Sequence, residues 1–309
     1  MQDIKEKIIQ LKKERDAVIL AHYYVPGDVQ DVADYIGDSY YLSKIAAKAE
    51  EKIIVFCGVY FMGESAKILN PSKTVLMPDL EADCPMAHMA AIRDIEKVRK
   101  DHPDAAVVCY INSTAEIKAH SDVCVTSSNA LQVIRALPNA TIYFIPDNNL
   151  GRYIAGLIPE KHFIFNEGFC HVHTDIGPQD IKNMKQEHLL AKVAAHPECR
   201  SEVLELADYI GSTSGMIDYV ENTDAKDFII CTETGVFHEI RHRVKGKNLY
   251  AAKEDQICPD MKKNTLEKVL QALESLKPEV SVPDQVLKNA RHPLDRMLQL
   301  SGMKSNEQI

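Results

Sequence analysis

Short apolar runs rich in β-branched residues alternate along this chain with amphipathic stretches of helical periodicity. Runs such as AVILAHYY, AVVCYINS and DFIICTE are typical of buried parallel strands. Stretches such as YYLSKIAAKAE, NALQVIRAL and TLEKVLQALESL have the period of helices that cover a sheet. This alternation predicts parallel sheets with helices on both faces.

The pattern is repeated along the chain. ADYIGDS around Asp34 returns as SDVCVTSS around Asp122 and as ADYIGSTSG around Asp208, at intervals of 88 and 86 residues. The same intervals separate the residues that end three apolar runs, His22, Tyr110 and His196. An internal repeat of this length indicates three copies of one α/β unit.

We therefore predict an α/β fold of three similar αβα sandwich domains, over residues 1–85, 86–171 and 172–262. The N-terminal helix and the tail, residues 263–309, are expected to pack on the first domain. The similarity of the copies predicts a pseudo-threefold arrangement around one central cavity. Loops after the carboxyl ends of the strands would line it, because ligands of open α/β sheets usually bind there.

Composition narrows the function. Of 309 residues, 45% are hydrophobic and 26% charged, an ordinary globular balance. No apolar run approaches the roughly 20 residues of a membrane-spanning helix, and the charged N-terminal helix does not resemble a signal peptide. We expect a cytoplasmic protein, whose cysteines bind metal or are buried rather than forming disulfides. A net charge of −9 argues against nucleic acid as a partner.

Three of the eight cysteines follow the repeat. Cys84, Cys170 and Cys258 lie 86 and 88 residues apart, each after the last apolar run of its unit. If the units surround an axis, these thiols converge on it. The cysteines inside apolar runs are interpreted as core residues, namely Cys57, Cys109, Cys124 and Cys231. Cys199 stays undecided.

Converging thiolates suit two kinds of metal centre. With His173 they could complete a structural zinc site. A 4Fe-4S cluster normally takes four thiolates, so three would leave one iron open to substrate as a Lewis acid. The contiguous cysteine spacing of ferredoxins is absent, which favours a non-redox role for such a cluster.

Polar residues share the phase of the repeat. Tyr24, Asn112 and Glu198 each lie two positions after His22, Tyr110 and His196, respectively. Side chains two apart on a strand share a face. Ser39, Ser127 and Thr213 recur at 88 and 86 residues, each close to the start of a helical stretch. Such hydroxyls could be helix N-caps, and they could also bind an anionic ligand beside free backbone N–H groups.

A competing motif is H-E-x-x-H, formed by His238, Glu239 and His242, which on a helix can bind zinc with the glutamate as a base. The equivalent helices FMGESAKIL and NNLGRYIAG lack the histidines. The flanking RHRVKGK is typical of a solvated basic surface, so we interpret the motif as lying off the shared axis.

Taken together, these segments resemble the quinolinate synthase family of NAD biosynthesis over nearly the whole chain. The motifs that carry the resemblance are AHYY, QDVADYIGDS, GVYFMGESAKILNP, CPMA, YINSTAE, TSSNA, GFCHVH, HPEC, GSTSGM, TETG and CPDMKKNTL. Tyr23 and His171 depart from residues common in relatives. The C-terminal cysteine pair that some relatives carry is absent, so no redox switch of that kind is expected.

The resemblance implies a transferase that condenses iminoaspartate with dihydroxyacetone phosphate, releasing phosphate and water to give quinolinate. It implies a 4Fe-4S cluster on Cys84, Cys170 and Cys258, with His22 orienting the triose and with Tyr24 and Glu198 transferring protons. The residues implied to bind the substrates are His22, Ser39, Tyr110, Asn112, Ser127, His173, His196, Glu198 and Thr213, of which Ser39, Tyr110, Asn112, Ser127, His196 and Thr213 would hold carboxylates and phosphate. L-Aspartate oxidase or aspartate dehydrogenase would supply the imine. A cluster-bearing sensor or carrier, and a hydro-lyase acting on one hydroxy acid, remain the alternatives.

Overall fold

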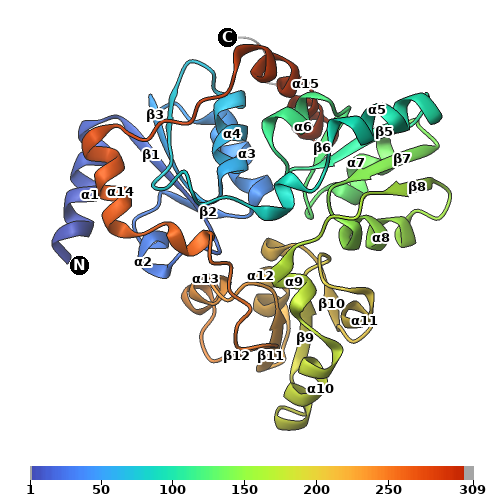
Figure 1. Ribbon diagram of the computed structural model, residues 1–309. Coiled ribbons are helices and arrows are strands. Elements are labelled where there is room, and N and C mark those ends of the chain that lie inside the picture. Colours follow the sequence, from blue (N-terminus) through green and yellow to red (C-terminus); the bar gives the residue numbers. More distant parts are fainter. Residues whose placement is uncertain (1, 303–309) are drawn as a thin grey trace.

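The computed structural model describes residues 2–302 and contains three separate four-stranded parallel sheets. Their strand orders are β2-β1-β3-β4, β6-β5-β7-β8 and β10-β9-β11-β12, which is the same order in each unit. Figure 1 shows the three sheets in three lobes that meet near the middle of the molecule. The prediction of three α/β units is confirmed.

The first unit has two fully buried central strands, β1 (Ala17–His22) and β3 (Ile53–Cys57), between the partly exposed β2 (Tyr35–Gly37) and β4 (Thr74–Leu76). Its helices are α1 (Gln2–Glu14), α2 (Gly27–Gln30), α3 (Ser39–Lys48) and α4 (Tyr60–Leu69).

The second unit repeats this plan. Its strands are β5 (Ala106–Tyr110), β6 (Val123–Val125), β7 (Thr141–Ile145) and β8 (His162–Phe165). A 3₁₀ turn, η1 (Pro85–His88), leads into it, and its helices are α5 (Ile92–Asp101), α6 (Ala115–Ala119), α7 (Ala130–Ala136) and α8 (Asn148–Leu157).

The third unit has the shortest second strand. Its strands are β9 (Lys192–Ala195), β10 (Tyr209–Ile210), β11 (Asp227–Cys231) and β12 (Asn248–Ala251). Its helices are α9 (His171–Asp175), α10 (Pro178–Glu187), α11 (Ser201–Leu204), α12 (Thr213–Asn222), α13 (Val236–Arg243) and the 3₁₀ turn η2 (Met261–Lys263).

The repeated aspartate has the same structural role in each unit. Asp34 accepts a hydrogen bond from the backbone N–H of Ile19 at 2.8 Å, and Asp122 accepts one from Val107 at 2.7 Å. Asp208 does the same with Val193 at 2.8 Å. Each carboxylate thus fixes the start of the second strand beside the first, which explains why this residue marks the repeat.

The tail does not pack on the first unit alone. Helix α14 (Leu266–Ser275) lies against α1 and β3, as expected, whereas α15 (Asp284–Leu300) packs on α6 and β6 of the second unit as well as on α4. The reason is that the apolar side of α15, which includes Ala290, Leu294 and Met297, is buried in the joint core of the first two units. Met1 and residues 303–309 lie outside the described residues.

The hydrophobic core is divided by the third sheet. One cluster spans the first two units and the tail, and includes Ala194 and Phe228 from one face of the third sheet. A smaller cluster contains Val193 and Ile229 from the opposite face. This alternation is the period of two expected of a strand buried on both sides. Within residues 2–302, no helix has the length and apolar character to cross a membrane.

Candidate active site

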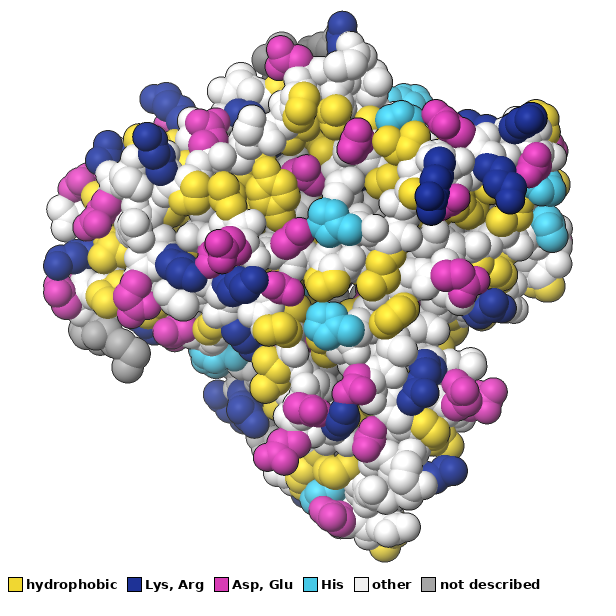
Figure 2. Space-filling model, viewed as in Figure 1, with side chains coloured by type: hydrophobic (Ala, Val, Ile, Leu, Met, Phe, Trp, Pro, Cys, Tyr) yellow, Lys and Arg dark blue, Asp and Glu magenta, His cyan; other side chains and the backbone are white. Residues whose placement is uncertain are grey.

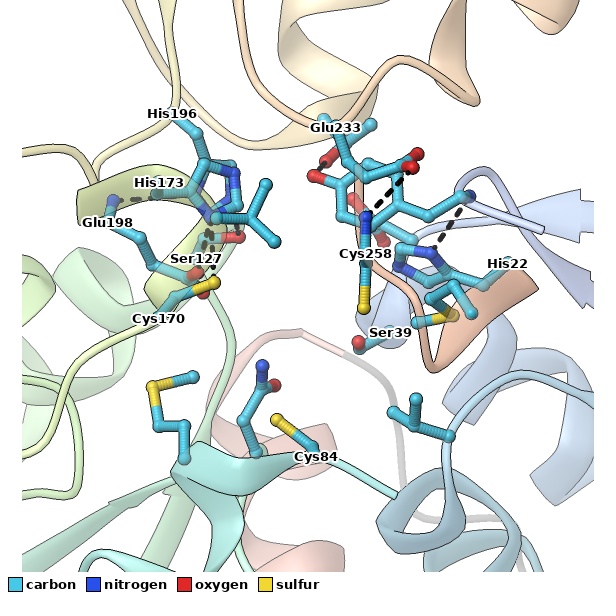
Figure 3. A pocket seen from close by; sticks show the side chains of 18 of the residues that line it. His22, Ser39, Cys84, Ser127, Cys170, His173, His196, Glu198, Glu233 and Cys258 are labelled. Atoms are coloured by element: carbon cyan, nitrogen blue, oxygen red, sulfur yellow. Dashed lines mark hydrogen bonds and ion pairs between the residues drawn. The ribbon is translucent and has the colours of Figure 1, made fainter. Parts of the chain in front are cut away.

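One cavity lies where the carboxyl ends of strands from all three units come together. All thirteen residues predicted from the sequence line it, together with others: His22, Tyr24, Ser39, Cys84, Tyr110, Asn112, Ser127, Cys170, His173, His196, Glu198, Thr213 and Cys258. Figure 3 shows labelled side chains from the three units directed into this space. The sequence repeat therefore located a real convergence of side chains.

The three cysteines that recur with the repeat, Cys84, Cys170 and Cys258, enter the cavity from different sides (Figure 3). Cys84 precedes η1, Cys170 precedes α9, and Cys258 lies between β12 and η2; each is half-buried with a free thiol. Burial raises the pKa of each of the three thiols, to about 11 for Cys258. A thiolate therefore forms at these positions only with a cation to replace its lost hydration.

The remaining cysteines are core residues. Cys57, Cys109, Cys124 and Cys231 are fully buried within strands, which confirms the interpretation from sequence. Cys199 is also fully buried, in the core of the third unit, and its thiol donates to the Cys231 carbonyl at 3.4 Å. Cys199, which the sequence left undecided, is thus a packed core residue.

The spacing of the three thiols distinguishes two kinds of metal centre. Thiolates around one tetrahedral zinc ion, at bonds of about 2.3 Å, lie only about 3.8 Å apart. Among the described residues, the groups whose ligand atoms all lie within 4.8 Å of one another are Cys170, His173 and Glu198, and a surface group on α13. The three cysteines together are not such a group. At least one pair of their sulfur atoms is therefore more than 4.8 Å apart, which is wider than the separation of thiolates on one shared zinc ion.

Two histidines occupy equivalent turns at the ends of β1 and β9. Nδ1 of His22 accepts the backbone N–H of Tyr24 at 3.2 Å, and Nδ1 of His196 accepts that of Glu198 at 3.3 Å. Burial lowers the pKa of His22 to about 4 and that of His196 to about 3. Both rings are therefore neutral near pH 7. Because Nδ1 is an acceptor, the proton is on Nε2, which for His196 lies 3.2 Å from the Ser127 hydroxyl.

Glu198 is the buried anion of the site. The Tyr110 hydroxyl donates to its Oε1, and Nδ1 of His173 lies 2.9 Å from its Oε2. Burial alone would raise the pKa of this carboxyl, but the neighbouring imidazoles and these hydrogen bonds outweigh burial and lower the pKa to about 2. Glu198 is thus a carboxylate in contact with two groups that can exchange protons.

Tyr24 stands on the opposite side of the same network. Its hydroxyl is hydrogen-bonded to the hydroxyls of Thr213, at 2.7 Å, and Thr232, at 2.6 Å. Thr232 is also 2.8 Å from Nε2 of His173. Burial raises the pKa of Tyr24 well above its usual value, so the phenol is protonated.

The hydroxyl residues that recur with the repeat, Ser39, Ser127 and Thr213, are not helix N-caps. The interpretation of these residues as N-caps is therefore wrong. Ser39 and Thr213 are the first helical residues of α3 and α12, and the capping side chains are those of Asp38 and Ser212. Ser127 lies before Asn129, which occupies the N-cap position of α7. The caps sit one residue earlier or two later than the sequence suggested. The hydroxyls that line the cavity are thereby free of the capping role.

Two buried acceptors in the cavity wall have no partner. Oδ1 of Asn112 and Oγ1 of Thr126 are buried and make no hydrogen bond among the described residues. Buried polar atoms are nearly always paired, because an unpaired group costs about 1–3 kcal/mol. Unpaired atoms that face a cavity therefore indicate a polar ligand there.

Comparisons with known proteins identify the family. The family model described as quinolinate synthetase A protein matches residues 6–299. A quinolinate synthase of Fusobacterium nucleatum is 51% identical over 299 residues, covering 97% of this chain and 100% of that protein. A quinolinate synthase of Clostridioides difficile is 48% identical over 300 residues, covering 97% of this chain and 99% of that protein.

The chain belongs to the quinolinate synthase family. The departures noted in the sequence are compatible with the site: Tyr23 is buried beside it, and His171 lines the cavity.

The sequence analysis of this quinolinate synthase family member assigned no role to Glu233, which lies just after β11. Glu233 is fully buried; its Oε1 accepts the N–H of Cys258 at 3.2 Å and its Oε2 accepts that of Gly235 at 2.6 Å. Nζ of Lys262 lies 2.7 Å from Glu233 and donates to the Tyr24 carbonyl at 2.6 Å. Glu233 thus holds the loop that carries a cavity cysteine. Its position directly after a strand was the signal that could have identified it.

The outer surface near the cavity is mixed in charge. On the face shown in Figure 2, histidine and hydrophobic side chains gather where the three lobes meet, and the charged side chains are spread over the lobes.

Proposed function

We propose that this chain is a quinolinate synthase that condenses iminoaspartate with dihydroxyacetone phosphate, releasing phosphate and water, in NAD biosynthesis. The observation that carries the proposal is the convergence of one cysteine and at least three polar side chains from each unit on one cavity. The names of the relatives and the family model support the same reaction.

Cys84, Cys170 and Cys258 would hold a 4Fe-4S cluster in this proposal. The fit rests on three free thiols in one cavity, on their spacing, and on the two unpaired acceptors nearby. A cluster bound through three thiolates supplies an open iron that acts as a Lewis acid toward a substrate oxygen. The equal strand order of the three sheets supports a pseudo-threefold arrangement of the units around this centre.

The protein side chains would bind and orient two anionic substrates. The neutral rings of His22 and His196 present Nε2–H donors, so they hold carboxylate or phosphate oxygens without the cost of a buried charge. Ser39, Ser127, Thr213 and Asn112 add hydroxyl and amide groups, beside the N-terminal ends of α3 and α12.

Proton transfers are assigned to Tyr24 and Glu198. The phenol of Tyr24 is protonated and can donate, whereas the Glu198 carboxylate can accept. His173 and Tyr110 contact Glu198 directly, so a proton taken from substrate can be shared within the buried network. L-Aspartate oxidase or aspartate dehydrogenase would provide iminoaspartate.

The decisive experiment is anaerobic incubation of the iron-loaded protein with dihydroxyacetone phosphate and with iminoaspartate generated in place. We expect quinolinate as the product, identified by mass and chromatography. Protein with full iron content that forms no quinolinate would contradict the proposal and favour a sensor or carrier.

A further inference from the structure

A second group of metal-ligating side chains lies on the surface, between the first and third units. His238 and His242 are one turn apart on α13, with ring centroids 4.4 Å apart. Asp31 directly follows α2 of the first unit, and its Oδ1 lies 2.7 Å from Nε2 of His238. The ligand atoms of the three residues all lie within 4.8 Å of one another.

We propose that Asp31, His238 and His242 form a binding site for a divalent transition-metal ion of the zinc class. Two imidazoles and one carboxylate are a common ligand set for Zn²⁺ and Co²⁺. Tetrahedral bonds of about 2.1 Å place ligand atoms about 3.4 Å apart, so a small adjustment of partly exposed side chains is enough. The site is separate from the cysteine-lined cavity and does not depend on the proposed reaction.

The group lies at the surface, where Nε2 of His238 and Oδ1 of Asp31 are hydrogen-bonded to each other, and a bound ion would take the place of the proton between them. A Cβ atom at Gly27 would lie 2.4 Å from Nδ1 of His238, so the glycine allows this ring to approach α2 closely. Lys5 binds Oδ2 of Asp31 at 2.7 Å and leaves Oδ1 facing the histidines. A surface cavity of about 470 Å³ borders His238 and His242, which gives an ion access and room for water as a further ligand.

The structure also separates this site from a zinc site of the H-E-x-x-H type, in which Glu239 would act as a base. Glu239 is turned away from the two histidines, and its Oε1 accepts a hydrogen bond from Nε of Arg243 at 2.6 Å. The carboxylate that completes the group is Asp31, from another unit. The chemistry is therefore that of a metal link between two units, and not of a metal-activated water with a neighbouring glutamate base.

A bound ion would reinforce an existing contact beside the main cavity. Nε2 of Gln30 donates to the carbonyls of Tyr23, at 2.9 Å, and Gly235, at 3.1 Å, so the same two segments are already joined there. An ion bound only by the folded protein stabilises it by mass action. Metal at this site should therefore raise the thermal midpoint.

The test uses untagged, iron-loaded protein under anaerobic conditions, titrated with Co²⁺. We expect one equivalent to bind with the weak visible absorption of nitrogen and oxygen ligands, without the intense near-ultraviolet band of a cobalt thiolate. His242→Gln and Asp31→Asn should each weaken binding at least tenfold. The control His162→Gln, which removes an exposed histidine on β8, should bind like the unmodified protein.

A second measurement is the thermal midpoint with and without Zn²⁺. It should rise with Zn²⁺ in the unmodified protein and in His162→Gln, and stay unchanged in His242→Gln. Equal Co²⁺ affinity in the unmodified protein and His242→Gln would overturn the proposal. A thiolate band, or an equal loss of affinity in His162→Gln, would overturn it as well, since the ion would then reside at cysteines or at scattered surface histidines.

Discussion

The hydroxyl of Tyr24 and the carboxylate of Glu198 are connected through two intermediate side chains. Tyr24 is hydrogen-bonded to Thr232 at 2.6 Å, Thr232 lies 2.8 Å from Nε2 of His173, and Nδ1 of His173 lies 2.9 Å from Glu198. The chain of contacts is buried throughout. It joins residues of the first and third units, and it gives the two proposed proton-transfer groups a common route.

Replacing Thr232 by valine should break this route. Valine keeps the shape but removes the hydroxyl between Tyr24 and His173, so we expect turnover to fall by about 10²-fold. Iron content should stay normal. The unpaired Nε2 of His173 should cost about 1–3 kcal/mol of stability. Steady-state rates and iron analysis check this.

Thr232→Ser is the matched variant, because it restores a hydroxyl at the same place. We expect it to recover most of the activity. If valine and serine variants turn over equally, the hydroxyl of Thr232 has no part in the reaction.

Glu198→Gln and Tyr24→Phe test the ends of the route. Each substitution keeps the size of the side chain and removes a transferable proton or its acceptor, so turnover should fall by about 10²–10⁴-fold with iron content unchanged. Single-turnover formation of quinolinate is the measurement. Full activity in both variants would make these residues structural.

The repeat allowed most residues of this site to be predicted from the sequence, because equivalent positions carry chemically similar residues. His22 and His196 are alike, and Cys84, Cys170 and Cys258 are identical. Glu233 shows the limit: the equivalent residues are Val59 and Asp147, so the carboxylate recurs in the second unit but not in the first, and the repeat gave only a partial signal. The role of Glu233 depends on Cys258 and Lys262, which only the folded loop brings near.

The position of the tail shows a second limit. Helix α15 has an apolar side, and the first two units have the same strand order. Its periodicity predicts a packed helix and does not select a partner. The contact with α6 and β6 is decided by the joint core of the two units.

Acidification should destabilise the protein partly through His22. Burial lowers the pKa of His22 from 6.5 to about 4, so between these values the unfolded chain binds a proton that the folded chain does not. The stability that the neutral ring contributes is present above pH 6.5 and is lost as the pH falls toward 4. At pH 5.5 the loss should be about 1 kcal/mol.

The matching measurement compares thermal midpoints of the unmodified protein and His22→Gln at pH 7.5 and pH 5.5. Glutamine does not titrate, so the variant should lose less stability between the two values. The control His162→Gln should lose as much as the unmodified protein. An identical pH response in His22→Gln would show that the buried ring is not the titrating group.

The iron content of serine variants should distinguish the cysteines that bind the cluster from those that are core residues. Replacing Cys84, Cys170 or Cys258 by serine should prevent stable cluster assembly and abolish activity, because each thiolate supplies a bond that no other thiol in the cavity can replace. The variants Cys57→Ser, Cys109→Ser and Cys231→Ser should keep their iron and lose stability, because these residues are buried in strands. Full iron occupancy in Cys170→Ser would mean that the ligand set is wrong.

The hydroxyls of Ser39, Ser127 and Thr213 provide the sharpest test of the cavity, since the structure separates them from helix capping. Replacing each with alanine should weaken quinolinate binding by about ten- to a hundredfold, because a hydrogen bond to a charged group contributes about 1.5–3 kcal/mol. Stability should change little for Ser39→Ala, because Asp38 caps that helix. Thr213→Ala also removes the buried hydrogen bond to the Tyr24 hydroxyl at 2.7 Å, so it should cost about 1 kcal/mol. Ser212→Ala is the control: its side chain accepts the N–H of Gly215 at 3.2 Å, so it should cost about 1 kcal/mol of stability and leave quinolinate affinity unchanged. Titrating quinolinate against the cluster absorbance and measuring thermal midpoints on the same samples separates the two effects. Unchanged affinities in all three hydroxyl variants would refute a shared anion site and would remove the main support for a cavity built equally from the three units.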